Sequence, residues 1–316
     1  MQIEAIDVSG CFRAQGPVRG ADTRWWGSTV RGALGTALKN LLCTEPHRRC
    51  DRCRRREECQ FPRLWEPQRV ENRGPLRQMP PWLLRASWRG DRLWVGVRLF
   101  GPACAEEARL RIALEAALAR GLTRARVAFF PLAPLRSEPV AAWSPPPGTW
   151  DKPLVVQLLS PLRLVTDGKP RAKAPDFGSL VASTARRWKL ASLAWGWPPP
   201  VPPPPVVKVP TVHCEVVWRD LTRRSARQRA TITLGGLVGT IVYGGEWALA
   251  LPFLQVASLI GLGKLTTHGF GHVVFGVQHG LVSSGEESRS ATPGVARNAA
   301  ATSPPTSGEA PHRRSS

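Results

Sequence analysis

Residues 223–245 (RRSARQRATITLGGLVGTIVYGG), 247–263 (WALALPFLQVASLIGLG) and 261–276 (GLGKLTTHGFGHVVFG) decide the fold of the C-terminal half. The first segment starts with clustered arginines and continues as two alternating apolar runs broken by glycines, a pattern typical of paired strands. An apolar helical run and a glycine-rich loop follow. Glycine tolerates positive φ and lets backbone N–H groups approach an anion. We therefore predict a strand pair, a helix and a phosphate-binding loop.

The cations and glycines of this stretch are candidate RNA-binding residues. Glycine-rich turns often do no more than connect tightly packed strands, but the arginine cluster upstream favours a phosphate site. The candidates are Arg223, Arg224, Arg227, Arg229, Gly261, Gly263, Lys264, His268, Gly269 and Gly271.

The composition points to a polyanionic partner. The 316 residues carry a net charge of +21, and the sequence pI is about 11.2. Such an excess of basic residues is typical of proteins that bind nucleic acids. A membrane-surface protein can be equally basic, but the chain has no apolar segment of about 18 residues and no signal-peptide pattern at its start. We expect a soluble, cytoplasmic protein with no membrane partner.

The order of predicted elements repeats once along the chain. Each half has the order strand, helix, strand, strand, helix, strand, which is that of a ferredoxin-like (RRM-like) unit. The fold class expected is α+β, with two such units in tandem. We place the first unit at 1–140, with a cysteine-rich insertion at 43–67, a proline-rich linker at 141–152, the second unit at 153–280 and a disordered tail at 281–316.

Within these units the strands are expected at 3–12, 83–101 (a hairpin), 125–132, 155–165, 213–221, 230–243 and 271–277, and the helices at 28–42, 104–122, 176–195 and 247–262.

One face of the helix predicted at 28–42 carries Ser28, Arg31, Gly35 and Lys39 at spacings of three and four. Gly35 lowers the helix propensity by about 1 kcal/mol relative to alanine. A bare backbone there lets a second surface approach between two cations. The alternative is that Gly35 packs against the sheet and the cations are solvated.

Four of the seven cysteines lie between residues 43 and 59, in the arrangement Cys43-x6-Cys50-x2-Cys53-x5-Cys59. The C-x2-C pair is a common zinc knuckle, and two further thiols complete a four-ligand site. We expect a structural zinc ion with no open coordination position. Reduced free thiols and an iron–sulfur cluster remain alternatives.

The helix predicted at 176–195 places Arg186, Arg187 and Lys189 around Trp188. Cations beside an aromatic ring suit contacts to phosphates and unstacked bases. A solvated helix face is the alternative.

Taken together, these motifs resemble the CRISPR precursor-RNA-processing endoribonucleases, the repeat-cutting members of the RAMP superfamily. The similarity lies in R-x-x-x-R-Q before LGGLVG, the helix, GLGKLTTHGFG, and in VRGALGTALKNLLC before CQFPRLWEP, and it covers roughly residues 1–280. The resemblance implies tandem ferredoxin-like folds and repeat-specific cleavage of precursor crRNA. It also implies attack by the 2′-OH without a catalytic metal, giving 2′,3′-cyclic phosphate and 5′-OH ends. The bound hairpin product and other Cas effector subunits are the implied partners.

In that family the first helix and its neighbouring segments carry the chemistry. Here this helix contains no histidine, His47 is the nearest candidate base, and Tyr243 is the sole tyrosine of the chain. Alternatively, arginine and lysine clamp the phosphorane while water or a weakly positioned group is the base. The catalytic candidates are Arg24, Arg31, Lys39 and His47.

Two other functions compete with cleavage. The missing histidine and tyrosine favour a non-catalytic RAMP-type subunit that binds crRNA. The cysteine cluster is also compatible with a zinc-containing DNA-binding regulator. The high arginine content is compatible with a type IV-like member of the family.

Overall fold

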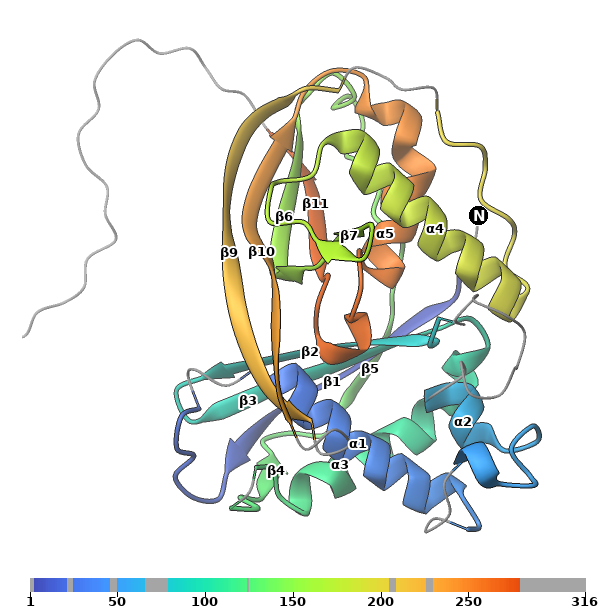
Figure 1. Cartoon of the computed structure of the whole chain (residues 1–316), viewed down its shortest axis with the longest axis vertical. Helices are drawn as coiled ribbons and strands as arrows, with labels where there is room; N and C mark the ends of the chain where they lie inside the picture. Colours follow the sequence, from blue (N-terminus) through green and yellow to red (C-terminus); the bar gives the residue numbers. More distant parts are fainter. Residues whose placement is uncertain are drawn as a thin grey trace, which may run out of the picture. The chain divides into compact units, whose positions relative to one another are not determined.

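The computed structural model describes residues 3–21, 25–45, 50–65, 79–123, 125–204, 209–225 and 230–278. They form two larger antiparallel sheets, each covered by its own helices, and a separate two-stranded sheet (Figure 1). Residues 1–280 belong to one compact unit. The predicted tail at 281–316 lies outside the described residues.

The first sheet is built from the N-terminal half of the chain. Its strands follow the order β2-β3-β1-β4, and β5 also pairs with β1. This is the strand order of a ferredoxin-like unit, with the helices packed on one face. The elements are β1 (Ala5–Ala14), α1 (Trp26–Leu42), η1 (Cys50–Arg52), α2 (Gln60–Trp65), β2 (Trp82–Arg89), β3 (Arg92–Phe100), η3 (Gly101–Glu106), α3 (Glu107–Ala119), β4 (Phe129–Pro131) and β5 (Arg136–Pro139).

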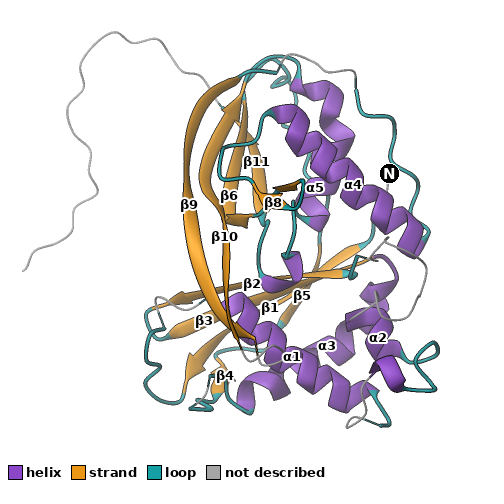
Figure 2. Cartoon of the chain, in the orientation of Figure 1, coloured by secondary structure: helices purple, strands orange, loops and turns teal. Residues whose placement is uncertain are grey.

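The second sheet repeats this arrangement in the order β11-β6-β10-β9. Figure 2 shows α4 and α5 beside this sheet, while α1 and α3 accompany the first one. The elements are β6 (Leu154–Leu162), β7 (Val165–Thr166), β8 (Lys169–Pro170), α4 (Phe177–Trp195), β9 (Thr211–Ser225), β10 (Ala230–Tyr243), η4 (Trp247–Ala250), α5 (Leu251–Ile260), η5 (Thr266–His268) and β11 (Val273–Val277). The predicted α+β fold with tandem ferredoxin-like units is confirmed.

The ends of α4 show how local sequence sets an element. The carboxylate of Asp176 accepts a hydrogen bond of 2.7 Å from the backbone N–H of Ser179, which caps the first turn. At the other end Gly196 adopts φ 68°, the left-handed conformation that commonly ends a helix. Among the described residues, none of the helices has the length and apolar character needed to span a bilayer.

Candidate nucleic-acid interface

The glycine-rich loop of the C-terminal half docks on the N-terminus of α1. The indole N–H of Trp25 donates a hydrogen bond of 2.7 Å to the carbonyl oxygen of His268. Ser28 Oγ lies 3.2 Å from His268 Nδ1. A Cβ on Gly27 would lie 2.2 Å from the carbonyl oxygen of His268. Glycine is therefore required at position 27 for this contact, and the two halves of the chain meet here.

Most of the glycines in this loop serve packing. Gly261, Gly263, Gly269 and Gly271 are all buried. The backbone N–H groups of Gly261, Gly269 and Gly271 donate to carbonyl oxygens of the protein itself. The prediction that these glycines present N–H groups to a phosphate is therefore wrong for these three positions, because the loop folds tightly onto its own neighbours. Lys264, by contrast, is exposed.

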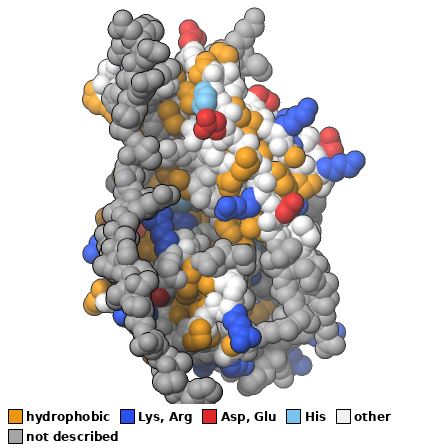
Figure 3. Space-filling model, turned by 90° about the vertical axis from the view of Figure 1, so that its left-hand side faces the viewer, with side chains coloured by type: hydrophobic (Ala, Val, Ile, Leu, Met, Phe, Trp, Pro, Cys, Tyr) orange, Lys and Arg blue, Asp and Glu red, His pale blue; other side chains and the backbone are white. Residues whose placement is uncertain are grey.

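A cleft of about 1090 Å³ borders this docking point. Trp25 and Gly269, which belong to the docked segments, lie in its wall. Its arginines are Arg85, Arg89, Arg92 and Arg219, and its tryptophans are Trp25, Trp26, Trp88 and Trp94. Figure 3, viewed from the side of β9, shows Lys and Arg side chains among hydrophobic ones. We call the cleft lined by these four arginines and four tryptophans the arginine–tryptophan cleft.

Arg85 is held in the wall of the cleft by an ion pair and an aromatic contact. Its Nη2 atom donates to Asp7 Oδ2 at 2.6 Å, and its guanidinium lies 5.3 Å from the ring centroid of Trp94. Burial alone would raise the pKa of Asp7, but hydrogen bonds and positive charge from Arg98 and Arg85 outweigh burial and hold that pKa below 3.8. Asp7 therefore stays ionised and fixes Arg85 against the wall of the cleft.

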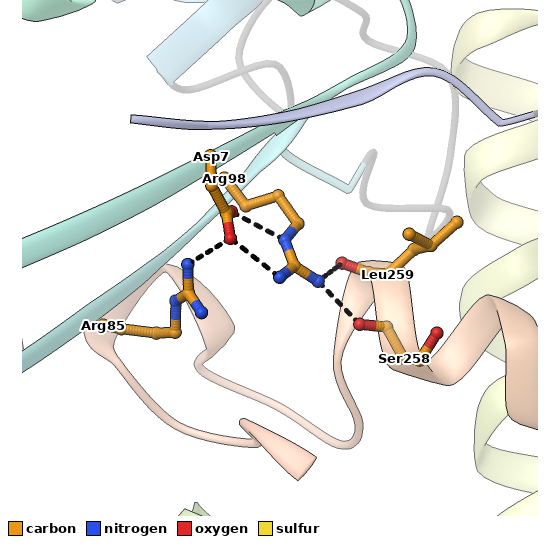
Figure 4. Close-up of polar contacts among 5 residues, drawn as sticks. All are labelled: Asp7, Arg85, Arg98, Ser258 and Leu259. Carbon is orange, nitrogen blue, oxygen red and sulfur yellow. Dashed lines mark hydrogen bonds and ion pairs between the residues drawn. The ribbon is translucent and has the colours of Figure 1, made fainter. Parts of the chain in front are cut away.

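Arg98 extends the same network to the C-terminal half (Figure 4). It donates to both carboxylate oxygens of Asp7, at 2.7 and 2.9 Å. Its Nη1 atom also donates to the carbonyl oxygens of Ser258 and Leu259, at 2.6 and 3.3 Å, in the last turn of α5. A cation at a helix C-terminus satisfies carbonyls that have no partner within the helix. Arg98 thereby ties the first sheet to the helix that leads into the glycine-rich loop.

His272 also lies in the wall of the cleft. Burial, and then the positive charges of Arg85 and Arg98, lower the pKa of His272 to about 4. Its imidazole is therefore neutral near pH 7, a state that the sequence alone did not indicate.

The predicted basic cluster of α4 divides into two kinds of residue. Arg186 and Lys189 are exposed, and their role as RNA contacts stays a prediction. Arg187 instead donates to the carbonyl oxygens of Ile260 and Gly263, at 2.6 and 2.9 Å, and burial lowers its pKa to about 10.

Arg187 therefore supports the glycine-rich loop from inside, which corrects its assignment as an RNA contact. Trp188 is 2% exposed and packs edge-on against Phe253, with ring centroids 5.6 Å apart. It is a core residue and not a platform for bases.

The central part of α1 faces tryptophans of its own half. The guanidinium carbon of Arg31 lies 5.2 Å from the ring centroid of Trp65 and 5.8 Å from that of Trp82. A Cβ on Gly35 would lie 2.4 Å from the indole nitrogen of Trp65. Gly35 thus packs closely against a neighbour, as the alternative interpretation held, although this neighbour is α2 rather than the sheet. Lys39 lies in the last turn of α1, and its catalytic role, like that of Arg31, stays a prediction.

Several predicted site residues are not placed by the structure. Arg24, His47, Arg227 and Arg229 lie outside the described residues. Arg223 and Arg224 lie in β9, where they pair with Ile232 and Thr231 of β10.

Tyr243 and the cysteines are among the residues that the structure describes. Tyr243 is fully buried and donates to the carbonyl oxygen of Pro175 at 2.7 Å, and burial raises its pKa. The cysteines, including Cys43, Cys50, Cys53 and Cys59, form no disulfide bonds with one another. Within the part of the chain that the structure describes, no three His, Cys, Asp or Glu side chains converge as metal ligands. The zinc site stays a prediction, which metal analysis of the purified protein tests.

The comparisons with known proteins agree with this geometry. The family model of the CRISPR-associated endoribonuclease Cas6 matches residues 156–273, and a model described as an N-terminal domain matches residues 12–139. The C-terminal unit of this chain is thus similar to the CRISPR-associated endoribonuclease Cas6.

Two solved structures share the Cas6 fold with this chain. One is a Cas6 product complex, with 14% identity, a TM-score of 0.52, and coverage of 87% of this chain and 100% of that one. The other is Cas6 of Thermus thermophilus, with 13% identity, a TM-score of 0.50, and coverage of 86% and 98% respectively. The comparison with curated proteins gave no match.

Proposed function

We propose that this chain binds the hairpin of a CRISPR repeat and cleaves the precursor crRNA beside it without a catalytic metal. The 2′-OH next to the scissile phosphate attacks that phosphate, which leaves a 2′,3′-cyclic phosphate and a 5′-OH. The observation that carries the proposal is the docking of the glycine-rich loop on α1 at the edge of the arginine–tryptophan cleft.

The cleft suits single-stranded RNA next to a hairpin. Four arginines in its wall match a phosphate backbone, and the partly exposed Trp25, Trp88 and Trp94 offer surfaces on which unpaired bases stack, whereas Trp26 is buried. Asp220 is the only acidic residue among the described residues that line the cleft. Arg223 and Arg224 follow Arg219 along β9 and are the proposed contacts to the stem. A stem is recognised there by A-form shape and phosphates, because the major groove of double-stranded RNA is too narrow to enter.

Cleavage requires stabilisation of the extra negative charge on the phosphorane. Arginines that remain protonated provide this stabilisation with bidentate hydrogen bonds. Arg24, Arg31 and Lys39 are the proposed clamp, with His47 as a candidate base. The same contacts bind the product, so we propose that the enzyme keeps the mature crRNA and presents it to effector subunits.

Incubation of the purified protein with repeat RNA in EDTA tests the proposed function. We expect a single cut per repeat, a cyclic phosphate on the upstream fragment and retention of the hairpin fragment on native gels. A DNA of the same sequence should be neither cut nor bound with comparable affinity. Intact RNA after long incubation with excess protein would contradict the proposed cleavage.

A non-catalytic crRNA-binding subunit is the second candidate. The observation that favours it is the position of Arg31, which lies over two tryptophan rings of its own half. Tight binding of the repeat hairpin without cleavage in the same experiment would support this candidate.

A further inference from the structure

Ser28 and His268 form a pair across the junction of the two halves. Ser28 belongs to the first turn of α1, and His268 ends η5 in the glycine-rich loop, 240 residues later in the chain. Their Oγ and Nδ1 atoms are 3.2 Å apart. A histidine absent from α1 itself is thus brought to α1 by the other half of the chain.

The loop holds His268 from several sides. The backbone N–H of His268 donates to the carbonyl oxygen of Leu265 at 2.8 Å, and its own carbonyl oxygen accepts from Trp25. Leu265 and Gly269, which flank η5, have φ of 67° and 88°. A positive φ at leucine is sparsely populated, and such conformations persist where the surrounding structure enforces them. The backbone of His268 is therefore held firmly against the start of α1.

His268 adjoins two residues that line the arginine–tryptophan cleft. Gly269, the next residue along the chain, lines the cleft, as does Trp25, which hydrogen-bonds the backbone of His268. The N-cap residue Trp25 makes no side-chain capping hydrogen bond, and the first turn of α1 has no acidic residue. A phosphate in the cleft near His268 therefore meets the positive end of a 17-residue helix.

We propose that His268 is the general base of RNA cleavage and that Ser28 positions it. This inference rests on the proposed function. The Nδ1–H group donates to Ser28 Oγ, and the lone pair of Nε2 accepts the proton of the attacking 2′-OH. A ring nitrogen held by a hydrogen-bonding partner leaves the other nitrogen in the correct tautomer for this task.

The step balances without a metal or a redox partner. Nε2 takes the 2′-OH proton as the 2′-oxygen forms a bond to phosphorus. The bond between phosphorus and the 5′-oxygen breaks, and the leaving oxygen takes a proton from water. The imidazolium then releases its proton to solvent, so the enzyme returns to its starting state.

His272 is a weaker candidate for the same role. It lines the cleft, but its imidazole is partly buried near Arg85 and Arg98. Burial and these positive charges, which Asp7 offsets only in part, oppose the imidazolium that a general base must become. His268 has its hydroxyl partner on α1 instead, in the helix that faces the loop.

Single-turnover cleavage of repeat RNA by the full chain tests this inference. The variant His268→Asn keeps an N–H donor for Ser28 but has no base, and we expect its cleavage rate to fall by about 100-fold or more while RNA affinity stays within about threefold. Imidazole in the buffer should restore part of the rate of His268→Ala. His213→Gln is the matched control, because His213 is an exposed residue at the far end of β9. It should cut at the wild-type rate.

Ser28 is tested as a positioning residue. Ser28→Ala should lower the cleavage rate about threefold to tenfold without weakening RNA binding, since one hydrogen bond is lost. Ser28→Thr retains the hydroxyl and should restore the rate, which a purely structural role of a small residue would not predict.

Three outcomes separate the inference from the function on which it rests. If the wild-type chain does not cut, both are overturned. If the wild-type chain cuts and His268→Asn cuts equally fast, only the role of His268 is overturned. If His47→Ala abolishes cleavage and imidazole does not rescue His268→Ala, the base lies on the α1 side and this inference is wrong.

Discussion

Replacing Arg98 with methionine removes a side chain that bonds both Asp7 and the end of α5. The side chain of Arg98 is 9% exposed and that of Asp7 is 19% exposed. The change deletes two hydrogen bonds to the carboxylate and leaves the carbonyl oxygens of Ser258 and Leu259 without this donor. Methionine fills much of the volume, so the loss is mainly polar.

Removal of one partner from a buried ion pair costs about 3–5 kcal/mol of unfolding free energy. We expect a value near the lower limit, because Arg85 still neutralises Asp7 from 2.6 Å away. For a domain of this size, about 3–5 kcal/mol corresponds to a fall in Tm of roughly 6–10 °C. The combined variant Asp7→Asn with Arg98→Met should lose about 1–3 kcal/mol less than the sum of the two single variants.

Urea unfolding followed by tryptophan fluorescence measures these changes. The control is Arg109→Met, because the side chain of Arg109 on α3 is 48% exposed where it pairs with Glu106 of η3 at 2.8 Å. Such an exposed pair contributes about 0.5 kcal/mol or less. Equal losses for Arg98→Met and Arg109→Met would refute the idea that Arg98 links the two halves.

Three further perturbations follow from the same geometry. Gly27→Ala should push the loop from α1 and cost about 1–3 kcal/mol, whereas Gly32→Ala in the same helix, where a Cβ meets nothing within 4 Å, should stabilise the chain by up to about 1 kcal/mol. Urea unfolding of both variants checks the contrast. Arg187→Met should lower both stability and cleavage, and Arg186→Met should affect only RNA affinity, as filter binding and single-turnover assays measure. In the folded chain His272 has a pKa of about 4, below the ordinary 6.5. As the pH falls, His272 therefore takes up a proton in the unfolded chain before it does so in the folded chain. The unfolding free energy should therefore fall by up to about 3 kcal/mol between pH 6.5 and pH 4, and His272→Gln should remove this dependence in urea titrations.

The tandem fold was predictable because periodicity and element order are local signals. The predicted helix at 176–195 matches α4, which spans Phe177–Trp195, and the predicted strand at 230–243 matches β10. No local sequence pattern predicted that the glycine-rich loop would contact the first helix. Their contact depends on residue pairs such as Ser28 and His268, 240 residues apart.

The cleft arginines were overlooked although the sequence carried a signal for them. In the hairpin of β2 and β3, Arg85 and Arg89 are separated by an even number of positions on β2, and so are Arg92 and Trp94 on β3. A period of two places these side chains on one face. The role of Arg187 was not predictable, because an arginine that supports a loop and one that contacts RNA look alike until burial is known.

The most direct test of the account replaces the single 2′-OH beside the cut with hydrogen in a synthetic repeat RNA. If the chain cleaves by internal attack, this RNA should bind with wild-type affinity and remain intact, while deoxy substitution two nucleotides away should leave the cut unchanged. A fragment released from the RNA that lacks the attacking hydroxyl would contradict the mechanism.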